Sequence, residues 1–190
     1  KQCFDSYRKL RNTVRYMLGS LSDFDPKLHA VPYQELPALD RYTLSVFAKF
    51  MRETQEAYDS YAFGRVFSLL QQLAVSDLSN FYLDLAKDRL YISSADEPRR
   101  RSCQTVLNVI LRGFLATLAP ILPHMAEDAW QALPYEVDET SVFQAGFGAG
   151  SGGVAEYAKA LPDDVAAEWV ALRALRDTAN KALEEARTQK

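Results

Sequence analysis

Cysteine and histidine are scarce in this chain. Its 190 residues include two cysteines, Cys3 and Cys103, and two histidines, His29 and His124. Small disulfide-dependent domains are short and rich in cysteine, whereas these two cysteines lie far apart in a long chain. The four side chains also lack the close spacing of metal ligands. We therefore expect reduced thiols and no metal site in this segment.

Long uninterrupted apolar runs are also missing. The most apolar stretch, residues 106–122, is interrupted by Asn108, Arg112 and Thr117. A membrane-spanning helix needs about 20 predominantly apolar residues, so this stretch is more typical of a buried helix. Hydrophobic residues make up 48% of the chain, which is enough for one well-packed domain. We predict no contact with a membrane.

Catalytic signatures are absent as well. The chain has no G-x-x-x-x-G-K-[ST] phosphate loop, no G-x-S-x-G elbow and no C-x-x-C pair. It opens Lys1-Gln2-Cys3, without an initiator methionine or a secretory signal, as expected for a piece of a longer protein. We predict no catalytic residues in this segment.

What the chain does contain is helical periodicity. Apolar residues recur every three to four positions, which predicts an all-α bundle of about five main helices. Pro98 and Pro123 stand where a helix favours proline, in its first turn. Ser76 or Ser79 is a candidate cap for a kink or a fresh helix start. The main helices are expected at residues 4–21, 38–61, 63–91, 98–118 and 163–187, with a short one at 123–133.

The helix at 98–118 is apolar on nearly every side, so we expect it at the centre of the bundle. The last helix carries a predicted buried stripe of Val165, Trp169, Leu172, Ala179 and Leu183.

Helical periodicity disappears between residues 134 and 162. Five of the eight glycines fall within 146–153, which predicts a flexible glycine-rich excursion. Residues 141–147 are compatible with one short strand. We therefore divide the chain into a helical bundle at 1–133, an irregular connection at 134–162 and a C-terminal helix at 163–190 that packs near the bundle.

Charge is unevenly distributed along the chain. The net charge is -3, yet residues 1–112 carry 16 Lys and Arg against 13 Asp and Glu. Residues 113–172 carry one Lys against nine Asp and Glu. A polyanion is repelled by the acidic stretch, so we expect it to meet the first part of the chain or the last helix.

Basic residues line one face of the first predicted helix. At about 100° per residue, Arg8, Arg11, Asn12 and Arg15 fall within roughly a third of the helix circumference, which we expect to lie away from the apolar stripe of Phe4, Val14 and Leu18. No acidic residue occurs between residues 6 and 22, which predicts that the charges have no partner on their own helix. Guanidinium groups match phosphate oxygens, so phosphate contact is one interpretation and a solvated face is the other.

Three further groups are candidates. Arg99 and Arg100 begin a helix, where basic residues oppose the helix dipole, and pairing with Asp96, Glu97 or Asp88 is the alternative. In the central block Asp84 can pair with Lys87, and for all the candidates there the alternative to an external contact is a polar contact that stabilises the bundle. The central candidates are Asn80, Lys87, Arg89 and Tyr91; those of the last helix are Arg173, Arg176 and Lys181.

Four sequence blocks carry a resemblance. They read Y-R-K-L-R-N-T-V at residues 7–14, S-N-F-Y-L-D-L-A-K-D-R-L-Y at 79–91, P-R-R-R-S-C-Q-T-V-L at 98–107 and I-L-P-H-M-A-E-D-A-W at 121–130. In this order they resemble the anticodon-binding helical region of isoleucyl-tRNA synthetases, which are class I aminoacyl-tRNA synthetases. The valyl, leucyl and methionyl families share the bundle but normally differ in the central block.

The resemblance implies that this segment holds the anticodon arm of isoleucine tRNA and so positions the tRNA for a catalytic domain elsewhere in the parent chain. It also implies an intracellular protein, in the cytoplasm or in an organelle with its own translation. The parent would use ATP with magnesium, whereas this segment would hold no cofactor, because the His-x-Gly-His and Lys-Met-Ser-Lys-Ser elements are absent. The alternative is a non-catalytic helical scaffold for protein interactions, with acidic residues 113–172 as its docking face.

Overall fold

The computed structural model describes residues 2–146 and 154–188, and within them every regular element is helical. This confirms the all-α prediction. The chain divides into two compact units, Lys1–Lys159 and Ala160–Lys190. The first contains α1 (Gln2–Ser20), α2 (Pro26–His29), the 3-10 turn η1 (Tyr33–Glu35), α3 (Ala38–Asp59), α4 (Phe63–Gln71), the π-helical segment η2 (Gln72–Tyr82), α5 (Leu83–Tyr91), α6 (Pro98–Leu118), α7 (Pro123–Gln131) and α8 (Val154–Tyr157); the second contains α9 (Asp163–Thr188).

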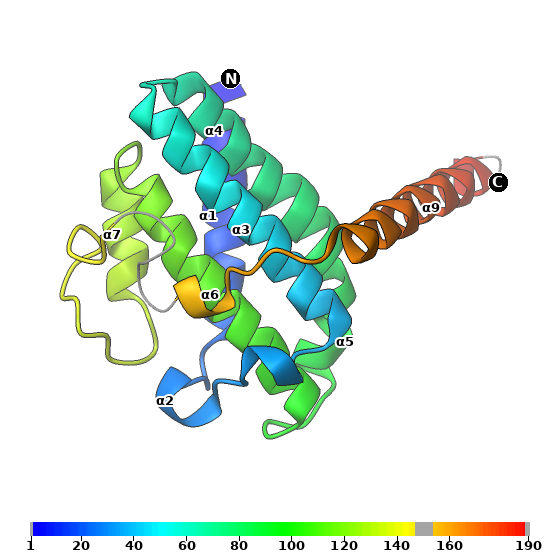
Figure 1. Cartoon of the computed structure of the whole chain (residues 1–190), viewed down its shortest axis with the longest axis horizontal. Coiled ribbons are helices and arrows are strands. Elements are labelled where there is room, and N and C mark those ends of the chain that lie inside the picture. Colours follow the sequence, from blue (N-terminus) through cyan, green and yellow to red (C-terminus); the bar gives the residue numbers. More distant parts are fainter. Residues whose placement is uncertain (1, 147–153, 189–190) are drawn as a thin grey trace. The chain divides into compact units, whose positions relative to one another are not determined.

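Helix α6 is the centre of the first unit, as its apolar sequence predicts. Helices α1, α3, α5 and α7 all pack against it (Figure 1). Leu107, Ile110 and Phe114 are completely buried, and the ring of Phe114 lies 6.3 Å from that of Phe50 on α3. Each such side chain contributes about 1.5–3 kcal/mol when it leaves water. Neither α6 nor any other helix in the described residues has the length and apolarity needed to cross a bilayer.

Helices α4 and α5 are joined by η2 into one continuous helical rod. The boundary residues Gln71 and Leu83 both keep right-handed helical backbone angles. Inside η2 the Ser79 hydroxyl donates to the carbonyl of Ala74, five residues earlier, at 2.7 Å. The Thr13 hydroxyl of α1 lies 3.1 Å from that of Ser79. The predicted kink near Ser79 is therefore a widened π-helical stretch against which α1 packs.

The segment after α7 is irregular but closely tied to the bundle. The indole nitrogen of Trp130 donates to the Glu139 carbonyl at 3.1 Å, and the Arg112 guanidinium pairs with the Glu139 carboxylate at 3.1 Å. The strand considered for 141–147 is wrong in its described part, because residues 141–146 form turns. Residue 147 and most of the predicted glycine-rich excursion lie outside the described residues.

Helix α9 has no buried residue. Its predicted stripe is therefore not buried in this unit: Leu172 is 53% exposed and Leu183 is 57% exposed. A helix with an apolar stripe buries it only when another element packs there, and the second unit contains no other helix among its described residues, so burial of this stripe stays a prediction.

Candidate nucleic-acid interface

The polar face of α1 is exposed in the structure. Arg8, Arg11, Asn12 and Arg15 all face solvent, while Leu10, Val14 and Met17 form the buried face. The predicted apolar stripe is shifted, because Phe4 is 67% exposed. Side chains four and seven positions apart, from Leu10 to Leu21, fill the core instead.

The α1 cations differ in their partners. Arg8 pairs with Asp5 at 3.3 Å, which corrects the expectation that no acidic residue on this helix meets them. Asp5 lies just before the stretch that lacks acidic residues and one turn from Arg8, so the two groups are neighbours. Arg11 and Arg15 have no ion-pair partner among the described residues. An exposed pair such as Arg8 with Asp5 contributes at most about 1 kcal/mol, so Arg8 can exchange it for another anion.

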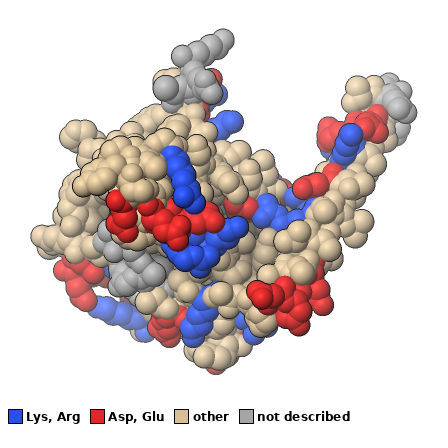
Figure 2. Space-filling view, turned by 45° about the horizontal axis from the view of Figure 1, so that its top comes forward, with Lys and Arg blue, Asp and Glu red and all other residues tan. Residues whose placement is uncertain are grey.

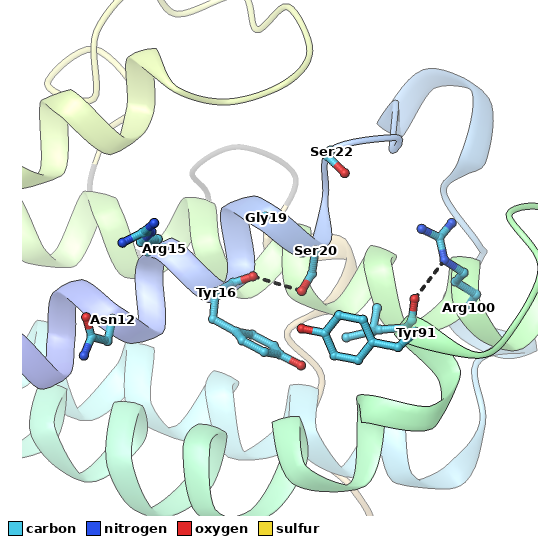
Figure 3. A pocket seen from close by; sticks show the side chains of 9 residues that line it. Asn12, Arg15, Tyr16, Gly19, Ser20, Ser22, Tyr91 and Arg100 are labelled. Carbon is cyan, nitrogen blue, oxygen red and sulfur yellow. Dashed lines mark hydrogen bonds between the residues drawn. The ribbon is translucent and has the colours of Figure 1, made fainter.

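Two adjoining clefts open beside α1 and share Asn12 and Tyr16. The first has a volume of 580 Å³ (Figure 3). The second, with a volume of 350 Å³, lies between α1 and the helical rod of η2 and α5. The first is lined by Asn12, Arg15, Tyr16, Gly19, Ser20, Ser22, Leu90, Tyr91 and Arg100, and the second by Lys9, Asn12, Thr13, Tyr16, Val75, Ser79, Asn80, Leu83 and Lys87.

Candidates from distant parts of the sequence therefore meet in one groove. Arg15 of α1 and Arg100 of α6 line the first cleft, and Asn80 and Lys87 line the second. Asn12 lies where the two clefts join. The sequence analysis missed Tyr16 and Lys9. Lys9 belongs to the same basic run as Arg8 and Arg11 and was detectable from it, whereas nothing in the sequence distinguishes Tyr16 from an ordinary core tyrosine.

Arg89 has a structural partner. Its guanidinium donates to both oxygens of Asp40, at 3.0 and 3.1 Å, and the Tyr82 hydroxyl donates to the same carboxylate at 2.9 Å. The Asp40 side chain is fully buried and that of Arg89 is 22% exposed. Burial raises the pKa of Asp40, while the charge of Arg89 and the hydrogen bond from Tyr82 oppose this rise. Arg89 thus holds α5 to α3 rather than pointing a free charge at the groove.

Arg100 is held in a similar way. Its two terminal nitrogens donate to the two carboxylate oxygens of Asp23 at 2.5 and 2.8 Å, and its Nε donates to the Leu90 carbonyl at 3.4 Å. The hydrogen bond from Arg100, with a further one from Gln104, holds the pKa of Asp23 well below its usual range. The neighbouring Arg101 is buried and contacts both Asp23 and Asp96. Arg100 therefore forms a wall of the first cleft.

The remaining candidates lie in the second cleft or on other surfaces. Arg99 is exposed at the start of α6. Lys87 lines the second cleft and pairs with Asp84 at 2.8 Å, as the sequence predicted. On α9, Arg173 and Arg176 are partly exposed and Lys181 is exposed.

Charges of both signs lie side by side on the face drawn in Figure 2. A broad basic field does not cover this face, so a polyanion that meets this face must be bound by a local arrangement of groups. In the described residues, His, Cys, Asp and Glu form no group of three that is able to hold a metal ion. The candidate site is thus a helical groove lined by cations, amides and tyrosines.

Comparison with known proteins defines the family. The model for the anticodon-binding domain of tRNA ligase matches residues 40–190. Isoleucine–tRNA ligase of Thermosynechococcus vestitus is 50% identical over 190 residues, which cover 100% of this chain and 19% of that protein. The isoleucine–tRNA ligase of Crocosphaera subtropica is 48% identical over 190 residues, which cover 100% of this chain and 19% of that protein. The isoleucine–tRNA ligase of a Cyanothece strain is 54% identical over 147 residues, which cover 77% of this chain and 15% of that protein. The chain belongs to the anticodon-binding domain family of tRNA ligases.

These relatives also confirm the resemblance to isoleucyl-tRNA synthetases that the four sequence blocks carry. The chain spans about a fifth of the length of the curated relatives it matches.

Proposed function

We propose that this segment binds the anticodon arm of isoleucine tRNA and positions the tRNA for aminoacylation by a catalytic domain of the parent chain. The observation that carries this proposal is the 50% identity to an isoleucine–tRNA ligase along the entire chain. The segment contributes binding energy and discrimination between tRNAs, which accelerates the reaction by placing the acceptor end correctly. Bond-making remains with the catalytic domain, which would use ATP with magnesium.

The groove beside α1 is the contact surface in this proposal. Arg11 and Arg15 bind backbone phosphates, because they are exposed and have no ion-pair partner among the described residues. Asn12 and Asn80 offer amide groups to sugars or base edges where the clefts line them. Arg8 and Lys87 join them by exchanging their exposed carboxylate partners for phosphate. Arg99, Arg173, Arg176 and Lys181 are proposed as additional contacts, while Arg89 and Arg100 support the groove.

The test is a filter-binding titration of the full-length protein with isoleucine tRNA and with a non-cognate tRNA across a salt series. Neutralising phosphates releases counterions, so affinity for isoleucine tRNA should fall steeply with salt. The non-cognate tRNA should bind more weakly at every salt concentration. Equal and background-level binding of both tRNAs would favour the alternative, a protein-interaction scaffold.

The place of action follows from the same proposal. A tRNA-binding segment works where translation occurs, so we place the protein inside the cell, in the cytoplasm or in an organelle with its own translation. The buried thiol of Cys103 suits this assignment, since burial raises its pKa to about 12 and keeps it protonated and unreactive.

A further inference from the structure

Two tyrosines meet in the first cleft. Tyr16 comes from α1 and Tyr91 is the last residue of α5, and Figure 3 shows their side chains next to each other, with Asn12 and Arg15 along α1 to one side and Arg100 to the other. Their ring centroids are 6.4 Å apart with an interplanar angle of 80°. An edge-to-face pair of this kind leaves a face of the outer ring open.

Tyr91 is unusually exposed for an aromatic residue in a cleft. It is 70% exposed, whereas the preceding Leu90, which also lines the cleft, is 8% exposed. The cleft therefore combines an apolar floor with an open aromatic ring. Aromatic side chains with a free face are the usual platforms for unstacked bases, because every base has a π-face to offer.

The Tyr16 hydroxyl is buried and forms no well-aligned hydrogen bond within the described residues, and its polar neighbour is Tyr91, which together with burial raises the pKa of Tyr16. A buried hydrogen-bond donor without a partner costs free energy, and a bound group that accepts a hydrogen bond from it removes this cost. Ribose and base edges carry such acceptors. The poorly bonded Tyr16 hydroxyl, next to the exposed Tyr91 ring, therefore adds a polar group to the cleft that suits a ligand with a hydrogen-bond acceptor.

The charged groups around the cleft have separate tasks. Arg100 donates hydrogen bonds to the Asp23 carboxylate and to the Leu90 carbonyl, and these bonds hold its side chain in place beside the end of α5. Arg15 is exposed and has no ion-pair partner in the part of the chain that the structure describes. It is thus the cation of this cleft that can reach a phosphate without breaking an internal contact.

We propose that the first cleft holds one unstacked nucleotide of the bound tRNA, with its base on the Tyr91 ring, an acceptor of the nucleotide at the Tyr16 hydroxyl and its phosphate beside Arg15. The inference rests on the proposed function and assigns one nucleotide to one cleft. The cleft volume of 580 Å³ lies within the range of about 300–1,000 Å³ that is usual for small-molecule sites. The contact is stacking, so it tolerates different bases at this position.

The test uses the full-length protein and isoleucine tRNA with 2-aminopurine placed in turn at each unpaired position of the anticodon loop. Wild-type protein should quench the fluorescence at one position through stacking. Tyr91→Ala should abolish this quenching and weaken tRNA binding about 5- to 150-fold, the range for loss of one base–aromatic stack. Tyr91→Phe keeps the ring and should retain both properties.

Salt dependence separates stacking from charge. Tyr91→Ala should leave the salt slope of tRNA binding unchanged, whereas Arg15→Gln should lower it by roughly one. Tyr16→Phe should weaken tRNA binding about 5-fold without lowering the unfolding temperature, because it removes a poorly bonded hydroxyl. The matched control is Tyr61→Ala, which removes a tyrosine that is 79% exposed and lines neither cleft, and should bind tRNA like wild type.

Two results would overturn this inference while leaving the proposed function intact. One is wild-type affinity and quenching in Tyr91→Ala, and the other is an equal loss of affinity in Tyr91→Ala and Tyr61→Ala. Failure of the wild-type protein itself to bind isoleucine tRNA above background would instead overturn the proposed function.

Discussion

Two sets of arginines in the first unit differ in whether they are paired with a carboxylate. On α1, Arg11 and Arg15 are exposed and meet no carboxylate among the described residues. On α5 and α6, Arg89 and Arg100 are bound by Asp40 and Asp23, which lie 49 and 77 positions away in the chain. The first set is available to an external anion, whereas the second set holds helices together.

The difference shows that the role of an arginine depends on whether a carboxylate lies next to it. This carboxylate can belong to another helix or to a loop far away in the sequence. A buried pair such as Arg89 with Asp40 is costly to break, because its removal leaves a desolvated charge. An exposed arginine costs almost nothing to neutralise in the free protein, so its effect should be seen only in binding.

The largest expected effect comes from Asp40→Asn. This change leaves Arg89 without its anionic partner inside the bundle and should lower the free energy of unfolding by about 3 kcal/mol. Urea denaturation measures the loss. The control is Asp84→Asn, which breaks the exposed pair with Lys87 and should cost about 0.5 kcal/mol or less. Equal losses in the two variants would show that Arg89 is not held more tightly than a surface cation.

Asp23→Asn should have a smaller effect, about 1–2 kcal/mol at pH 7, because the Asp23 side chain is 37% exposed and solvent screens its pairs. The pKa of Asp23 is depressed in the folded state, so its stabilisation is present above the ordinary value of 3.8 and is lost as the pH falls further. The gap between wild type and variant should therefore narrow below pH 3.8. Urea titrations between pH 3 and 7 would contradict the assignment if the gap stayed constant.

Thr13→Val should cost about 1 kcal/mol, because it removes the hydroxyl that meets Ser79 where α1 packs on the π-helical segment. Thermal unfolding followed by circular dichroism gives the shift. Thr178→Val is the matched control, since its hydroxyl bonds only its own helix on an exposed surface of α9. If both variants unfold at the same temperature, the contact between α1 and η2 adds no stability.

The smallest effect on stability is expected for Arg11→Gln combined with Arg15→Gln, which should change the free energy of unfolding by no more than about 0.5 kcal/mol. In the full-length protein the double change should lower the salt slope of tRNA binding by about two. Arg52→Gln, an exposed arginine of α3 outside both clefts, is the control. A double variant with wild-type affinity and slope would mean that the α1 face is only solvated.

Much of the fold was predictable because helical periodicity and proline positions are local signals. The bounds of α3 and α6 were close to those expected, and the apolar sequence of α6 correctly placed it at the centre. The π-helical form of η2 was not predictable, because it depends on hydrogen bonds among Ser79, Ala74 and Thr13 of another helix. The burial of the α9 stripe stays a prediction, since periodicity shows that a face is apolar but not which element covers it.

The membership of the candidate groove was only partly predictable. Arg15 and Asn12 were candidates from the polar face of the first helix and Lys87 was a candidate from the central block, and all three line the clefts. Tyr16 was missed, because its contact with Tyr91 and its place in the first cleft depend on the packing of α1 against the end of α5. Asp23 was missed as a partner of Arg100 for the same reason.

By itself the sequence determined the helical class, the buried central helix and the family. Periodicity and the order of sequence blocks can be read from the sequence without any information on packing. Only the tertiary structure decided which arginines remain available, because hydrogen bonds and charge pairs depend on distances of a few ångströms between residues far apart in the chain. It also decided that Asn12, Asn80 and Tyr91 border one groove, which forms where separate helices pack side by side.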